Sequence, residues 1–206
     1  MTALYQDLGA RVVAVEPIPY LAALIRRRFH ATVEQAAVGA TAGRLALRVG
    51  RVPNHSTLSP AYAERFADRL SDTTIDVEVV TLDQLVGRHG LPDFVKIDVE
   101  GLESEVLRGL HSPVAAICFE FQYDLLGVAE ECLLILDELG DYQFRFAENR
   151  LTGSTALWPD PSDPPADGRS LLARIKATMD ASSYGDVYSV NKDHGPSQPE
   201  RADRQE

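Results

Sequence analysis

The sequence places three charged residues, Lys96, Asp98 and Glu100, at the end of a short apolar run, where they alternate with apolar residues. In an extended strand alternate side chains point to the same face, so these three would lie in line, about 6.5 to 7 Å apart along the backbone. A lysine in such a run needs a carboxylate partner to offset the cost of its burial. The sequence predicts that Asp98 or Glu120 neutralises Lys96, either as a structural ion pair or in a site where Lys96 takes part in catalysis.

Further polar groups follow other predicted strands or lie in the loops between them. Glu16 ends the run VVAVE before a proline, where a carboxylate can accept hydrogen bonds from both hydroxyls of a ribose; an ordinary surface acid is the alternative. Glu120 follows five apolar residues, so its carboxylate requires a cationic partner or a bound ligand. Asn54 and His55 belong to a polar loop that either contacts a ligand or faces solvent.

The composition is that of a globular chain with an acidic surface. The 206 residues are 45% hydrophobic and 25% charged, which is enough apolar material for one packed α/β domain. Lys and Arg number 20 and Asp and Glu number 31, for a net charge of −11, which disfavours phosphate backbones and anionic membranes. We therefore expect no nucleic-acid or membrane partner, and the sequence predicts no particular oligomeric state.

The two cysteines, Cys118 and Cys132, lack metal-ligand spacing and lie in apolar patterns, so both are predicted to pack in the core. No run approaches the roughly 18 apolar residues of a membrane span. The N-terminus shows no basic segment followed by an apolar one, as an export signal would. These features predict a cytoplasmic protein.

Hydrophobic periodicity predicts strands that alternate with helices, and hence an α/β fold with a mostly parallel sheet. Strands are expected at residues 11–16, 32–39, 43–49, 76–80, 94–100, 114–121, 142–148, 151–157 and 186–190. Helices are expected at 1–8, 20–29, 61–70, 82–89, 103–110, 129–139 and 169–179. A hairpin about Asn149 would make the C-terminal edge of the sheet antiparallel. The domain is predicted to span residues 1–193, and residues 194–206 are predicted to form a disordered tail.

Several motifs together resemble the FkbM family of S-adenosylmethionine-dependent methyltransferases, from residue 9 to about residue 121. They are ARVVAVEP, AAVG, NHSTLS, VEVVTLDQL, FVKIDVEGLESEVLRG and FEF. Each motif alone would be weak, whereas their combination is specific. The resemblance implies the Rossmann-like methyltransferase sheet and S-adenosyl-L-methionine as cofactor. It also implies a small-molecule or saccharide partner, methylated at a hydroxyl group.

The resemblance assigns roles by position. Glu16 would take the ribose hydroxyls, Ala36 and Ala37 would line the adenine pocket, and Asp98 would lie beside the methionine end of the cofactor and the acceptor. The predicted catalytic residues are Asp98, Lys96 and His55, with Asp98 the first choice as base or acceptor-orienting group. The predicted substrate contacts are Asn54, Glu100 and Glu120. The roles of Lys96, Glu100 and Glu120 are open, and His55 matches no fixed family position.

The sequence departs from the family pattern at its start. Family members begin with a strand and a glycine-rich loop of the Asp-Val-Gly-Ala-Asn type, whereas Met1 already falls in the helix that follows this loop. We therefore predict a chain truncated at the N-terminus, whose sheet lacks its first strand. We also expect residues 1–206 alone to bind the cofactor weakly or not at all.

Three other functions stay open on the sequence alone. A nicotinamide-dependent oxidoreductase would also use Glu16 at a ribose. A metal-assisted transferase would hold Mg²⁺ with Asp98 and Glu100, but the sequence supplies no convincing further ligand, so no metal site is predicted. A non-catalytic remnant that acts at most as a binding module is the third alternative.

Overall fold

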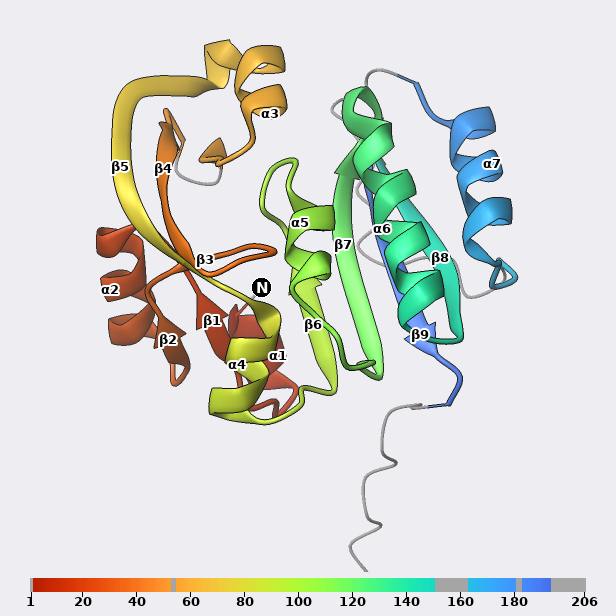
Figure 1. Cartoon of the computed structure of the whole chain (residues 1–206), viewed down its shortest axis with the longest axis horizontal. Helices are drawn as coiled ribbons and strands as arrows, with labels where there is room; N and C mark the ends of the chain where they lie inside the picture. Colours follow the sequence, from red (N-terminus) through yellow and green to blue (C-terminus); the bar gives the residue numbers. More distant parts are fainter. Residues whose placement is uncertain (1, 53–54, 151–162, 181–182, 194–206) are drawn as a thin grey trace, which may run out of the picture.

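The computed structural model describes residues 2–52, 55–150, 163–180 and 183–193, in which strands and helices alternate along much of the chain (Figure 1). The helices are α1 (Thr2–Asp7), α2 (Pro19–Arg28), α3 (Pro60–Arg65), α4 (Leu82–His89), α5 (Glu103–Arg108), α6 (Leu126–Leu139) and α7 (Gly168–Thr178), with short 3-10 turns η2 (Ala67–Arg69) and η3 (Tyr123–Leu125). The strands are β1 (Val13–Val15), β2 (Thr32–Glu34), β3 (Ala37–Val38), β4 (Gly43–Gly50), β5 (Leu70–Val80), β6 (Phe94–Ile97), β7 (Ala116–Gln122), β8 (Tyr142–Arg150) and β9 (Ser183–Asn191).

The strands form three sheets that mix parallel and antiparallel pairs. Strands β1 and β2 are parallel, and β5 lies between β3, to which it is parallel, and β4, to which it is antiparallel. The largest sheet has the order β6-β7-β9-β8, in which β6 and β7 are parallel and β9 is antiparallel to both neighbours. The α/β class and the antiparallel C-terminal edge are therefore confirmed.

The edges of β1 and β6 bear on the predicted absence of a first strand. Within the described ranges, β1 pairs only with β2 and β6 pairs only with β7. Strand edges of this kind leave backbone N–H and C=O groups without ladder partners. The absent strand itself stays a prediction.

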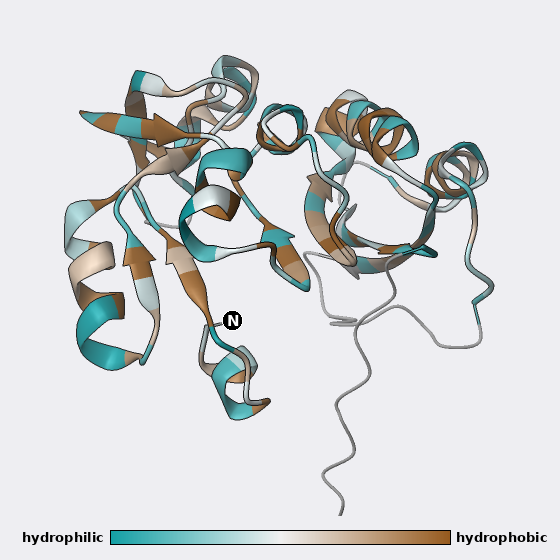
Figure 2. Cartoon of the chain, turned by 60° about the horizontal axis from the view of Figure 1, so that its bottom comes forward, coloured by the Kyte–Doolittle hydropathy of each residue, from teal (hydrophilic) through white to brown (hydrophobic). Residues whose placement is uncertain are grey.

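One face of the largest sheet carries the main core. Helices α5, α6 and α7 bury their apolar residues against it, and the hydropathy colours in Figure 2 show apolar residues gathered between these helices and the strands. Ile117 and Phe119 of β7, Leu136 of α6 and Ile175 of α7 are among its enclosed side chains. Both cysteines are buried, as predicted. The opposite face of β6, β7 and β9 carries polar side chains such as Lys96 together with apolar ones such as Phe94, because residues alternate between the faces.

The structure corrects two element boundaries in the first half of the chain. Residues 32–39 form two short strands rather than one: β2 pairs with β1, and β3 pairs with β5 in a different sheet. The helix predicted over 61–70 ends at Arg65, because η2 follows and β5, which was predicted over 76–80, already begins at Leu70. The predicted helix start is confirmed: the Ser59 side chain accepts a hydrogen bond from the Tyr62 amide.

Two further corrections concern strand ends. Strand β8 continues through Asn149 to Arg150 in register with β9, so Asn149 does not form the predicted turn. The long antiparallel ladder with β9 outweighs the turn preference of asparagine. Strand β6 ends at Ile97, so Asp98 and Glu100 lie in the turn that follows rather than in the strand.

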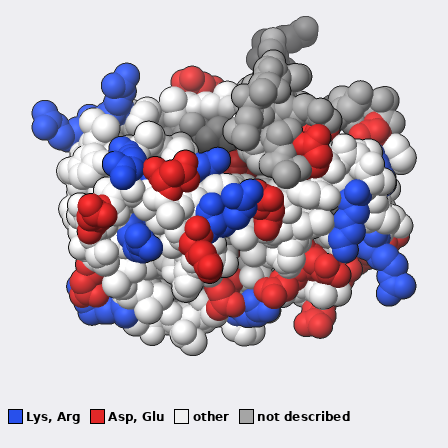
Figure 3. Space-filling view, turned by 90° about the horizontal axis from the view of Figure 1, so that it is seen from above, with Lys and Arg blue, Asp and Glu red and all other residues white. Residues whose placement is uncertain are grey.

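Some predictions fall on residues outside the described ranges: Asn54, the strand at 151–157 and the tail at 194–206. Among the described residues, no helix has the length and apolar character needed to cross a membrane. Acidic and basic side chains are interspersed on the face shown in Figure 3, rather than gathered into a patch of one sign.

Candidate functional site

The turn after β6 has a backbone conformation that side chains rarely adopt. Glu100 has φ 56°, the only non-glycine residue with positive φ in the described chain, and Gly101 has φ 95°. A Cβ at position 101 would lie 3.1 Å from Leu125 Cδ1 and 3.3 Å from Ser59 Oγ, so glycine is required there by both conformation and space. A left-handed residue that bears a side chain costs on the order of 1–3 kcal/mol and is a common mark of functional sites.

Two neighbouring groups hold this turn in place. The Glu103 carboxylate is buried and accepts hydrogen bonds from the Val99 and Gly101 amides, each at 3.2 Å. From the other side, the Thr57 hydroxyl donates to the Glu100 carbonyl oxygen at 2.8 Å and accepts from the Ser59 amide at 2.8 Å. Glu103 therefore has a structural role, and the loop before α3 is anchored to the turn.

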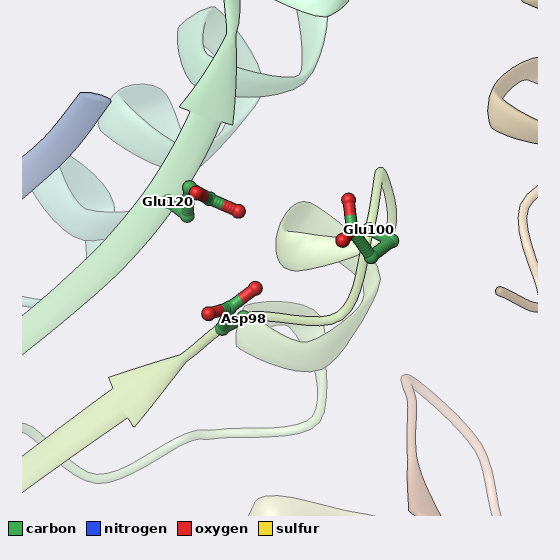
Figure 4. A group of neighbouring side chains, drawn as sticks. All are labelled: Asp98, Glu100 and Glu120. Atoms are coloured by element: carbon green, nitrogen blue, oxygen red, sulfur yellow. The ribbon is translucent and has the colours of Figure 1, made fainter. Parts of the chain in front are cut away.

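Three carboxylates meet at the adjoining ends of β6 and β7. Asp98 follows β6, Glu100 lies in the turn, and Glu120 projects from β7, as Figure 4 shows. One oxygen of each lies within 4.8 Å of the others. Gln122 Nε2 donates to Glu100 Oε2 at 3.0 Å, and a small pocket beside Glu100 and Glu120 is also lined by Leu125. We call Asp98, Glu100 and Glu120 the carboxylate cluster.

The environment of the carboxylate cluster disfavours full ionisation. Burial, together with the negative charges of Asp98 and Glu100, raises the pKa of Glu120 far above its ordinary value. Burial also raises the pKa of Glu100 to about 7, with further contributions from Asp98 and Glu103. A group with a pKa near 7 suits proton exchange at neutral pH, so the cluster has the properties of a site for acid-base chemistry or for a cationic ligand.

Lys96 forms its ion pair with a residue that the sequence reasoning missed. Its Nζ lies 2.5 Å from Asp186 Oδ1 of β9, and both side chains are 14% exposed. The predicted partners, Asp98 and Glu120, are therefore wrong, although the predicted pairing with a carboxylate is right. Burial opposes the charge on Lys96, but the surrounding acids, Asp186 and Asp98 among them, raise its pKa above the ordinary value. Lys96 thus remains an ammonium ion in a structural pair.

The residues predicted to contact the cofactor lie after β1 and at the start of β3. The half-buried Glu16 follows β1, and its Oε1 accepts a hydrogen bond from the Ile18 amide at 2.8 Å. Burial raises the pKa of Glu16. Ala36 and Ala37 are 3% and 7% exposed and pack in the two apolar cores.

Comparison with known proteins identifies the family. The model of the family described as Methyltransferase FkbM domain matches residues 1–146, which is more than half of the chain. The chain belongs to the FkbM methyltransferase family. No curated protein matches the chain in a search of that set. The family supports methyltransferase activity and does not favour the nicotinamide alternative.

The FkbM match includes the entire carboxylate cluster, as well as Glu16, Ala36 and Ala37. Asp186, the partner of Lys96, lies beyond the matched residues. Its position opposite Glu120 depends on the antiparallel register of β9 against β7. No short-range pattern in the sequence reveals that register, so the partner of Lys96 could be identified only from the structure.

His55 of this FkbM chain is half-buried beside Arg69 and Asp68 rather than within the carboxylate cluster. Burial lowers its pKa, and Arg69 adds to this effect. The sequence reasoning missed Tyr62, whose buried hydroxyl lies near Glu100, Gln122 and Arg69. Its place on an amphipathic helix indicates a core aromatic residue, and nothing in the sequence distinguishes it from one.

Proposed function

We propose that this protein transfers a methyl group from S-adenosyl-L-methionine to a hydroxyl oxygen of a sugar or small natural product. The observation that carries the proposal is the carboxylate cluster at the adjoining ends of two parallel strands, in a chain of the FkbM family. Ligands of open α/β sheets bind beyond the carboxyl ends of the strands. The cluster lies at such an edge.

The charge of the cluster favours this donor over a dinucleotide. S-adenosyl-L-methionine carries a positive sulfonium and an ammonium group, which neighbouring carboxylates attract. A nicotinamide dinucleotide carries a negative pyrophosphate, which Asp98, Glu100 and Glu120 would repel. Electrostatic complementarity therefore supports the methyl donor.

In the proposed complex, Glu16 binds the ribose hydroxyls of the donor, and Ala36 and Ala37 lie beside its adenine. Glu16 is suited to this role because burial and a single amide contact leave carboxylate lone pairs for two hydroxyl donors. Asp98, which is exposed, lies at the methionine end.

The proposed reaction is a direct displacement at the methyl carbon. The acceptor oxygen forms a bond to this carbon as the carbon–sulfur bond breaks, and the bonding electron pair stays on sulfur in S-adenosylhomocysteine. Asp98 takes the hydroxyl proton or orients the hydroxyl, and Glu100 and Glu120 contact the acceptor. Holding both substrates in line supplies much of the acceleration.

Ligand-detected NMR tests the donor assignment, because saturation transfer reports weak binding as well as moderate affinity. We expect S-adenosylhomocysteine to bind the 206-residue chain weakly, with a smaller signal for Glu16→Gln and an unchanged one for Glu138→Gln on the exposed face of α6. Binding of NAD in preference to S-adenosylhomocysteine would refute the proposal. Release of S-adenosylhomocysteine in the presence of a panel of sugars would then identify the acceptor.

A further inference from the structure

The carboxylate cluster concentrates negative charge without a matching cation. Among the described residues, no lysine, arginine or histidine forms an ion pair with Asp98, Glu100 or Glu120, and the nearby Lys96 is bound to Asp186. The hydrogen bond that a neighbouring side chain donates to the cluster comes from the Gln122 amide, and it reaches only Glu100. Three close carboxylates of this kind repel one another unless protons or a cation compensate their charge.

A second observation comes from Tyr62, which belongs to a different element, α3. Its side chain is fully enclosed, and its Oη makes no hydrogen bond within the described part of the chain. This hydroxyl lies beside the Glu100 carboxylate and the Gln122 amide, so it is directed at the cluster. A buried hydroxyl without a partner costs about 1–3 kcal/mol. A water molecule coordinated by a cation in the cluster would supply the missing partner.

The donor set selects the kind of cation. All three groups offer carboxylate oxygens, which bind hard divalent cations such as Mg²⁺, Mn²⁺ and Ca²⁺ in preference to softer metals. At Ca²⁺–oxygen distances of about 2.3–2.6 Å, opposite ligands lie about 4.6–5.2 Å apart, and for Mg²⁺ about 4.2 Å apart. The oxygens of the cluster lie within 4.8 Å of one another. Oxygens this close can converge on a single hard cation, and the longer Ca²⁺–oxygen distances require less movement of the side chains than those of Mg²⁺.

We propose that Asp98, Glu100 and Glu120 together bind one divalent cation. The sequence suggested two of these ligands and no third; the pairing of β6 with β7 brings Glu120 to them. Glu100 directs its carboxylate to the ion from a left-handed backbone conformation, and Gln122 orients that carboxylate. If the proposed function holds, on which this one statement rests, the cation binds the acceptor through its hydroxyl oxygen and makes that hydroxyl more acidic.

Electron paramagnetic resonance of Mn²⁺ tests the site in the 206-residue chain, without donor or acceptor. We expect one Mn²⁺ per chain to lose its free-ion signal and to be released by excess Mg²⁺ or Ca²⁺. Glu120→Gln and Glu100→Gln should each weaken Mn²⁺ binding by about tenfold or more, since each removes one charged ligand. Glu138→Gln removes a charge from exposed α6 and should bind as the wild type does.

Two results would overturn the proposal: no bound Mn²⁺, or equal binding by Glu120→Gln and Glu138→Gln, which would show general attraction to an acidic surface. Circular dichroism of each variant shows whether it is folded, and Glu100→Gln provides a second probe if Glu120→Gln is not. The S-adenosylhomocysteine binding experiment is run in chelator, so its outcome does not depend on cation binding. Mn²⁺ binding together with a preference for NAD over S-adenosylhomocysteine would refute the proposed function and leave the cation site intact.

Discussion

Two adjoining parts of the same sheet face balance their charges differently. At Lys96, an ammonium and the Asp186 carboxylate form a close pair, and both are largely shielded from water. One step further along the strands, Asp98 and Glu120 meet with no cation from the described residues to compensate them. The charges of the first group balance within the protein, whereas those of the second are offset by protons or, as we propose, by a bound cation.

The largest expected effect comes from removing the cation of the Lys96–Asp186 ion pair. Lys96→Met leaves the Asp186 carboxylate buried without its cation, which should lower the free energy of unfolding by about 3–5 kcal/mol. Urea denaturation measures this change. Arg44→Met breaks the surface pair with Asp76, whose side chains are over 60% exposed, and should cost about 1 kcal/mol or less. Equal costs for the two variants would show that the Lys96 pair is not specially shielded.

The second prediction concerns Asp98 of the carboxylate cluster. Asp98→Asn should reduce methyl transfer by about 100-fold, since general-base or orienting groups contribute this much or more. S-adenosylhomocysteine should still bind, but more weakly than to the wild type, because Asp98 is proposed to lie at its methionine end. Asp72→Asn, an exposed change on β5, is the control. Full turnover by Asp98→Asn with the donor still bound would remove Asp98 from the proposed chemistry.

Strands with acidic ends could be predicted from the sequence, because they depend on local patterns. Apolar runs that end in Glu16, Asp98 and Glu120 predict strands with polar exits, and the structure has strands there. Parallel neighbours then bring Asp98 and Glu120 together, since β6 and β7 are close in sequence and in register.

The partner of Lys96 could not be predicted, because it depends on contacts distant in the sequence. Asp186 reaches Lys96 only through the pairing of β9 with β7, which joins segments more than 60 residues apart. The left-handed conformation of Glu100 could not be predicted either, because alternation in the sequence favoured a strand. A turn forms instead, held by the hydrogen bond from the Thr57 hydroxyl and by the one that the Glu103 carboxylate accepts. Tertiary contacts outweighed local preference at both positions.

The third prediction tests whether the turn positions the cluster. Gly101→Ala should destabilise the fold by about 2 kcal/mol, because φ is positive and the new Cβ would crowd Leu125 and Ser59. Gly9→Ala is a matched control: its φ of 83° is similar, but nothing lies within 4 Å of the new Cβ, so it should cost about 1 kcal/mol. Thermal unfolding measures both. If the two variants are equally destabilised, crowding at the turn is unimportant, and Mn²⁺ binding by Gly101→Ala should then match the wild type.

The smallest effect is a dependence of stability on pH, measured in chelator. Glu100 has a pKa of about 7 in the folded protein, above its value of about 4.3 in the unfolded chain, so the folded state holds the proton more tightly. Its contribution to stability is therefore full below about pH 4.3 and is lost as the pH rises through 7. Glu100→Gln avoids this loss and can keep the hydrogen bond from Gln122. Urea denaturation should show similar stability for variant and wild type at pH 4.5, and an advantage of about 1–2 kcal/mol for the variant at pH 8. A difference that does not change with pH would mean that the cluster is already balanced without a ligand, as the Lys96 pair is.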